Sequence, residues 1–139
     1  MTACRACVGG YLGLSLLDGC SSTKMVNGSI QDSDLIVPLS EFGGAEGNQG
    51  QYGESVIVRN AALKFPLYVY RTGGDTFIAL WMRCTHQGTE LQVFGQRLEC
   101  PAHGSQFDIG GVVLRGPADT NLKSFPVRID NNQLKISLR

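Results

Sequence analysis

The sequence predicts an all-β fold, and three observations support this class. The chain has 139 residues, the size of one domain with enough residues to bury a core. After residue 34, short apolar runs alternate with turn signals, and none keeps a helical period for about ten residues or more. Glycine contributes 18 residues, well above its average usage. We therefore expect a head of short strands from residue 34 to the C-terminus.

The strands of this head can be placed in order along the chain. Residues 34–42 open it with an apolar run that Pro38 interrupts, which favours an edge strand. Residues 41–55 follow as a glycine-rich loop. Further strands are expected within residues 55–60, 67–72, 76–84, 90–94, 96–100, 123–130 and 133–139.

Three turns are expected to join neighbouring strands as hairpins. Gly73-Gly74-Asp75 separates the runs at 67–72 and 76–84. Gly95 lies between the two short runs that follow, and Asn131-Asn132 lies between the last two.

The first 33 residues differ from the head. Residues 1–20 hold an apolar segment after a single arginine, of signal-peptide length and too short to span a bilayer. Its end resembles a bacterial lipoprotein cleavage site, so we expect a signal or lipoprotein leader with Cys20 as the lipidated residue. The alternative is an apolar N-terminal anchor that packs on the domain or on a partner. Residues 21–33 are polar without an apolar period, so we expect a flexible linker.

Composition and charge limit the class of partner. Hydrophobic residues make up 42% of the chain and charged residues 17%, as in a lightly charged globular protein. The twelve basic and twelve acidic residues balance, so the composition shows no excess of positive charge that would indicate binding to nucleic acid. No run approaches the length of an ordinary transmembrane helix.

The only two histidines each follow a cysteine closely. Cys84-x-His86 and Cys100-x-x-His103 lie on loops at strand ends, and the hairpin at 90–100 would bring the loops side by side. Three interpretations are open: incidental pairs, a structural zinc site with Cys₂His₂ ligands, and a two-iron cluster. Zinc fingers group like ligands together, whereas here each loop carries one of each. A cluster with both cysteines on one iron and both histidines on the other explains the mixed spacing.

The residues around these pairs resemble the Rieske [2Fe–2S] family. Residues 84–88 read CTHQG and match C-T-H-x-G, and residues 100–105 read CPAHGS and match C-P-x-H-G-S. Downstream, Gly116 and Pro117 fall where the family has a proline loop packed over the cluster. The resemblance covers residues 34–139.

This resemblance implies a fold and a cofactor. The fold is an antiparallel β sandwich with a small inserted cluster-binding subdomain, at about residues 84–109. The cofactor is one [2Fe–2S] cluster per chain. The implied ligands are Cys84, His86, Cys100 and His103.

Four neighbouring positions bear on the reduction potential by the same resemblance. Ser105 occupies the position whose hydroxyl, in the quinol-oxidising branch, donates to a bridging sulfide and raises the potential. Phe107 stands where that branch usually has a tyrosine donor, so the packing is kept and the donor is lost. Thr89 and Ala102 stand where that branch has a disulfide. These mixed signals predict an intermediate potential, above oxygenase-type ferredoxins and below the disulfide-bearing quinol branch.

The resemblance implies an electron carrier without catalysis of its own, because no histidine remains for the separate iron site of a Rieske oxygenase. We expect a membrane-associated subunit of a quinol-oxidising or related respiratory complex. His103 would be the exposed ligand that meets the quinol, and a cytochrome would take the electron. The head would then lie on the periplasmic side of a bacterial cell membrane.

Two alternatives to this function stay open. The first is a soluble or lipid-tethered ferredoxin that serves a reductase or oxygenase, for which a cytoplasmic location is expected. The second is a zinc-stabilised binding module without redox activity.

Overall fold

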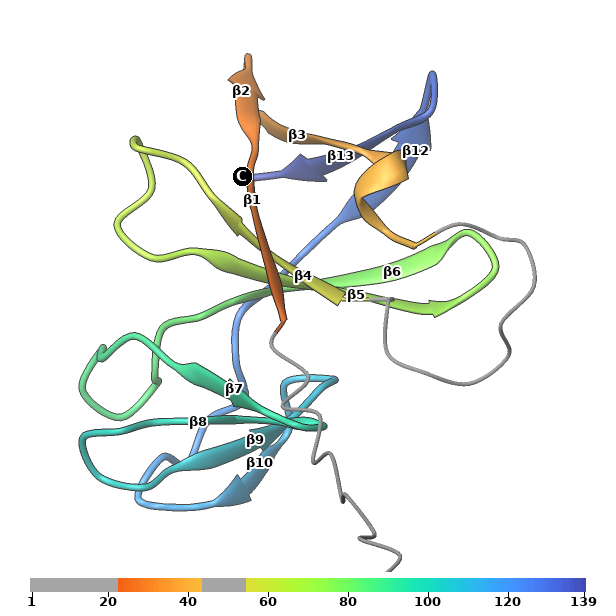
Figure 1. The fold of residues 1–139 in the computed structure, drawn as a ribbon. Coiled ribbons are helices and arrows are strands. Elements are labelled where there is room, and N and C mark those ends of the chain that lie inside the picture. Colours follow the sequence, from red (N-terminus) through yellow and green to blue (C-terminus); the bar gives the residue numbers. More distant parts are fainter. Residues whose placement is uncertain (1–22, 44–54) are drawn as a thin grey trace, which may run out of the picture.

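The strands form three stacked sheets (Figure 1). The structure is a computed structural model and describes residues 23–43 and 55–139. The expected leader with Cys20, and residues 44–54 of the glycine-rich loop, lie outside the described residues. Within the described part, no helix is long and apolar enough to cross a membrane.

The central sheet has the order β1-β4-β5-β6-β11. Its strands are β1 (Lys24–Asn27), β4 (Ser55–Arg59), β5 (Leu67–Gly73), β6 (Thr76–Trp81) and β11 (Ser124–Phe125). The outer sheet has the order β12-β13-β3-β2 and a short 3₁₀ helix beside it. Its elements are β2 (Ser29–Gln31), β3 (Asp34–Pro38), η1 (Leu39–Glu41), β12 (Val127–Asp130) and β13 (Gln133–Ser137).

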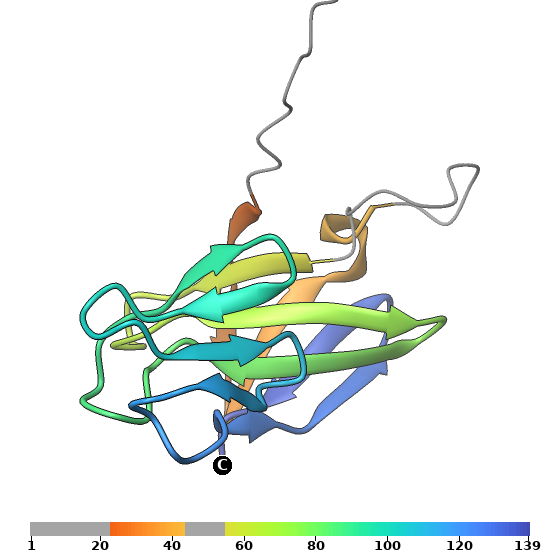
Figure 2. The same ribbon diagram turned by 90° about the horizontal axis from the view of Figure 1, so that it is seen from below.

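The small sheet has the order β10-β9-β8-β7 and lies on the other side of the central sheet (Figures 1 and 2). Its strands are β7 (Gln92–Phe94), β8 (Arg97–Glu99), β9 (Gln106–Asp108) and β10 (Val113–Arg115). The all-β class is thus confirmed, and so are the three hairpins around residues 73–75, Gly95 and 131–132.

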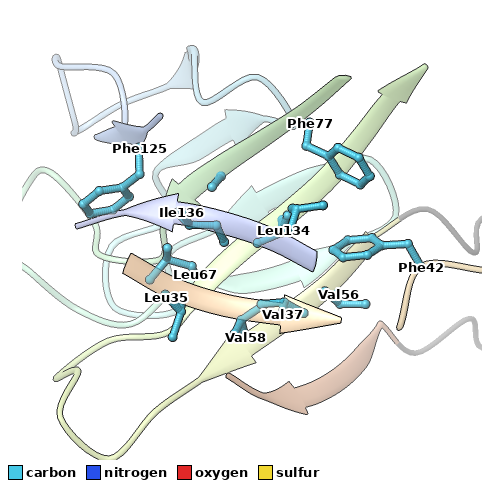
Figure 3. Close-up of a cluster of buried hydrophobic side chains, with 12 residues drawn as sticks. Leu35, Val37, Phe42, Val56, Val58, Leu67, Phe77, Phe125, Leu134 and Ile136 are labelled. Atoms are coloured by element: carbon cyan, nitrogen blue, oxygen red, sulfur yellow. The ribbon is translucent and has the colours of Figure 1, made fainter. Parts of the chain in front are cut away.

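The central sheet is apolar on both faces, which places it in the middle of the molecule. Val56 and Val58 of β4 point into the core shared with the outer sheet, while Ile57 between them packs on the core under the small sheet. Leu134 and Ile136 of β13 close the first core from the outer sheet (Figure 3). The alternation of side chains along each strand therefore creates two separate cores.

Residues 24–31 are strands, so the flexible linker expected over 21–33 is wrong for this segment. β2 pairs antiparallel with β3, and β1 pairs in parallel with β4. The parallel pair departs from the purely antiparallel sandwich that was expected. Most side chains of β1 are exposed, and only Val26 packs on the core. The sequence of this strand therefore lacks the alternation of apolar and polar residues that would have predicted it. Its pairing depends on a strand far along the chain.

The edge position expected for β3 is also wrong, because β3 lies between β13 and β2. Pro38 is tolerated there because it ends the strand. It stands opposite Gln133 of β13, whereas β2 pairs only with residues 34–36. The run at 123–130 is likewise two strands: Pro126 divides β11, which pairs with β6, from β12, which pairs with β13.

Candidate metal centre

The first cysteine–histidine loop follows β6 and leads into β7. The Cys84 N–H donates to the Thr89 carbonyl at 2.8 Å, and the Gly88 N–H donates back to the Cys84 carbonyl at 2.9 Å. Gly88 has a φ of 77°, a conformation that glycine adopts without strain. Backbone hydrogen bonds thus close the loop at 84–89 on itself.

The second loop, between β8 and β9, repeats this frame. The Cys100 N–H donates to the Ser105 carbonyl at 2.8 Å, and the Gly104 N–H donates to the Cys100 carbonyl at 2.9 Å. Gly104 has a φ of 76°. Each loop therefore begins at a cysteine, turns at the glycine four residues later, and closes at a hydroxyl residue. Within this shared frame the histidine is the third residue of one loop and the fourth of the other.

Both cysteines are buried and reduced, with Cys84 1% exposed and Cys100 2% exposed. Burial acts to raise the pKa of the Cys100 thiol, but hydrogen-bond donors outweigh it and the net pKa is lowered. In order of effect these donors are the backbone N–H groups of His103 and Ala102, then the side chains of Cys84 and Thr89. The loop therefore favours the thiolate, which is the form that binds metal.

The two histidines lie side by side at the exposed tips of the loops. The ring centroids of His86 and His103 are 5.0 Å apart, with an interplanar angle of 87°. The convergence of the two loops that the hairpin predicted is thus confirmed. Each loop offers one buried sulfur and one exposed imidazole, which is a suitable donor set for two irons with two protein ligands each. Across residues 23–43 and 55–139, no three His, Cys, Asp or Glu side chains group around one metal position.

Ser105 is completely buried beside this centre. Its Oγ accepts a hydrogen bond of 3.0 Å from the Ala118 N–H, which follows Gly116 and Pro117. The hydroxyl proton is thereby left for a second acceptor, because a serine hydroxyl donates once and accepts twice. The expected proline loop therefore packs against the second loop through Ser105.

The proline loop also contacts the first loop. The Thr85 hydroxyl donates to the Thr120 carbonyl at 2.7 Å, across 35 residues of sequence. The segment from Gly116 to Thr120 is thereby tied to both cysteine–histidine loops, and it fixes them relative to each other.

Phe107 fills the core beneath the centre and is completely buried. It packs with Leu98, Leu91 and Met82 in the core under the small sheet. A phenyl ring supplies this packing and no hydrogen-bond donor.

An all-β fold with two matched loops, each offering one thiolate and one imidazole, defines the class of two-iron proteins with mixed ligation. Residues 45–126 match the family described as the Rieske [2Fe-2S] domain, and the chain belongs to this family. It transfers electrons through a [2Fe–2S] cluster. The family membership decides between the cluster and the zinc site that the sequence left open.

The chain is similar to proteins of two kinds, a dioxygenase ferredoxin and a cytochrome b6-f subunit. The chain is 33% identical over 76 residues to the ferredoxin component of the naphthalene 1,2-dioxygenase system of Pseudomonas putida, covering 52% of this chain and 72% of that protein. It is 34% identical over 76 residues to the cytochrome b6-f complex iron-sulfur subunit of Prochlorococcus marinus, covering 52% of this chain and 43% of that subunit. The match thus spans less than half of that subunit.

Among solved structures, the chain is similar to the plasma membrane Rieske protein of Synechocystis PCC 6803. The TM-score is 0.51 with 25% sequence identity, covering 60% of this chain and 86% of that one.

Sequence reasoning missed the contacts that hold the centre together. The shared loop frame has a visible signal, because a glycine stands four residues after each of Cys84 and Cys100. The hydrogen bonds from the Ala118 N–H to Ser105 and from Thr85 to Thr120 have no such signal, since they join segments far apart in the chain.

Proposed function

We propose that this chain is a membrane-associated electron carrier of a quinol-oxidising or related respiratory complex. The cluster would be held by Cys84 and Cys100 at one iron and by His86 and His103 at the other. When bound, it supplies a one-electron couple at about −150 to +300 mV. The two matched loops would supply the ligands, and the proline loop is hydrogen-bonded to both loops.

The observation that carries this proposal is the environment of Ser105. The side chain is completely buried, and one of the two acceptor positions of its hydroxyl is used by the Ala118 N–H. The remaining hydroxyl proton can donate to a sulfur of the centre, and donors to sulfur favour the reduced state. A raised potential suits a carrier that takes electrons from a quinol.

The exposed histidines give this site its contact with substrate. Both His86 and His103 are exposed, while the cysteines behind them are buried. In the proposal, His103 accepts the hydrogen bond of the quinol and holds the transferred proton at its outward ring nitrogen. The similarity to a plasma membrane Rieske protein and to cytochrome b6-f subunits supports a location at a bacterial membrane, with the head on the periplasmic side. The leader at residues 1–20, with Cys20 as the lipidated residue, would provide the attachment.

A Rieske-type ferredoxin that serves a reductase or oxygenase is the second candidate, and specific residues favour it. Thr89 and Ala102 cannot form the disulfide of the quinol-oxidising branch, and Phe107 lacks a donor. The similarity to the naphthalene dioxygenase ferredoxin points the same way. This candidate would carry a lower potential.

A redox titration followed by electron paramagnetic resonance tests the proposal on the full-length holoprotein and on Ser105→Ala. A hydrogen bond to a charged acceptor contributes about 1.5–3 kcal/mol, which corresponds to roughly 65–130 mV for a one-electron couple. We expect a positive potential that falls by about this amount in Ser105→Ala. Ser105→Thr keeps the hydroxyl and is the matched control.

Two outcomes would contradict parts of the proposal. A negative potential in the wild type, unchanged in Ser105→Ala, would make the chain a ferredoxin. An intact cluster signal in His103→Ala would remove the ligand assignment.

A further inference from the structure

Three exposed cationic side chains, those of Lys64, Arg83 and Lys123, take no part in the proposed chemistry. Each charge is held over an aromatic ring. The distances from charge to ring centroid are 5.5 Å for Lys64 and Phe65, 5.3 Å for Arg83 and Trp81, and 4.7 Å for Lys123 and Phe125. No acidic side chain of the described residues forms an ion pair with any of these three cations.

The three cation–aromatic pairs adjoin one another, with the cations exposed and the rings of Phe65 and Phe125 buried. The rings of Phe65 and Trp81 meet edge to face, with centroids 5.8 Å apart. The backbone N–H of Trp81 donates to the backbone carbonyl of Lys123 at 2.9 Å, which places the third pair next to the other two. We call these six residues the cation–aromatic surface: Lys64, Phe65, Trp81, Arg83, Lys123 and Phe125.

This surface adjoins the candidate centre. A Cβ added to Gly88 would lie 3.0 Å from a terminal nitrogen of Arg83, so the guanidinium packs directly on the first loop. The same loop carries Cys84 and the exposed His86. A partner seated on the surface would therefore stand next to the histidines.

Several other cations of the described structure are paired with carboxylates, as Lys24 is with Glu41, Arg59 with Glu90 and Lys135 with Asp130. Arg71, Arg115 and Arg139 also form no ion pair with a described acidic residue, but unlike the three cations above they do not adjoin one another through a shared set of aromatic contacts. The chain as a whole has a net charge of zero, and the loops at 84–89 and 100–105 contain no Lys, Arg, Asp or Glu. A neutral tip with a cationic flank steers a negatively charged partner to one side of the centre.

We propose that the cation–aromatic surface docks a redox protein whose cofactor is surrounded by carboxylates. The inference deepens the proposed function by giving the chemistry of the partner, and it rests on the electron-transfer role alone. The contacts between cations and rings hold the cations in place before binding, which reduces the ordering cost of the complex. Binding there brings the partner's cofactor close to His86 and His103.

The test uses the reduced full-length holoprotein and two one-electron oxidants of opposite charge. Hexacyanoferrate(III) is an anion and tris(phenanthroline)cobalt(III) is a cation, and each takes one electron, so that its metal is reduced from the +3 to the +2 state. The variant is the double substitution Lys64→Gln with Lys123→Gln. Arg139→Gln is the single-charge control, because Arg139 is exposed and the C-terminus lies on the outer-sheet side (Figure 1).

At low ionic strength we expect the double variant to react about tenfold more slowly with hexacyanoferrate(III) and faster with the cobalt complex. Salt should remove both differences, and Arg139→Gln should match the wild type. A plant-type [2Fe–2S] ferredoxin of net negative charge is the protein probe. Its reduced form should pass an electron to the oxidised double variant more slowly than to the wild type.

Three outcomes would overturn the proposal. Equal loss of rate with both oxidants would mean that the variant has damaged the centre. A double variant that behaves like Arg139→Gln would mean that the surface does not steer. Loss of binding to phosphatidylserine vesicles in the double variant, with unchanged ferredoxin kinetics, would assign the surface to a lipid. A negative reduction potential would contradict quinol oxidation and leave this inference untouched.

Discussion

The two cores of this molecule differ in how far they depend on the metal centre. The core between the central and outer sheets is made of hydrocarbon side chains contributed by long strands, such as the seven-residue β5 and the six-residue β6. The core under the small sheet is supported by three-residue strands and includes both candidate ligand cysteines. Part of the second core is therefore the site itself, so metal binding and local folding are linked there.

Replacing Cys100 is the strongest way to test this difference. In Cys100→Ser we expect loss of the cluster signal and of most bound iron, because one iron loses a thiolate ligand. Hydrogen exchange should then speed up in residues 84–122, while β4, β5 and β6 stay protected. Uniform loss of protection over both cores would contradict the separation of the two regions.

Shortening one buried leucine in each core compares the two regions without removing a candidate ligand. Leu98 and Leu134 are both 0% exposed, one in each core. Either change to alanine should cost about 2–5 kcal/mol of local packing. Leu134→Ala should lower the global unfolding midpoint and leave the electron paramagnetic resonance spectrum intact. Leu98→Ala should lower cluster retention at a temperature where the outer sheet is still folded; equal effects of the two variants would contradict the comparison.

An ion pair joins the two regions and should matter little. Arg59 of β4 contacts Glu90, the residue after the first loop, at 2.5 Å, and their side chains are 47% and 39% exposed. Exposed pairs of this kind contribute about 0–1 kcal/mol. Glu90→Gln should therefore change the free energy of unfolding, measured with urea, by less than about 1 kcal/mol. A larger loss of unfolding free energy would show that this ion pair couples the small sheet to the central sheet.

The smallest effect is expected at Asp130, within the outer sheet. Hydrogen bonding and charge attraction from Lys135, at 2.5 Å, lower the pKa of the Asp130 carboxyl. A lowered folded-state pKa adds stability that is fully present above the unfolded value of about 3.9 and is lost as the pH falls through the folded-state pKa. Asp130→Asn should thus unfold at a slightly lower urea concentration than the wild type at pH 7, and this difference should shrink toward pH 2. A difference that stays undiminished at pH 2 would contradict this assignment.

Local chemistry decided which parts of the fold could be predicted. The turns at 73–75, Gly95 and 131–132 depend on residues inside the turn, so the sequence alone was enough. The cysteine–histidine loops were predictable for the same reason. β1 was not, because it is mostly polar and pairs with β4, whose residues lie about thirty positions away. The Thr85–Thr120 contact was missed for the same physical reason.

The repeated loop frame has a consequence for engineering. Since the same two backbone hydrogen bonds hold each loop, the frame does not depend on which residue carries the imidazole. The two loops are therefore versions of one backbone frame that differ in their side-chain contacts, since Ser105 accepts from the Ala118 N–H in one loop and Thr85 donates to the Thr120 carbonyl in the other. We expect the double substitution His86→Ala with Gln87→His to keep this backbone frame. A scaffold with two neighbouring hairpins could receive this frame as a graft, provided that it also supplies a core in which the two cysteines are buried.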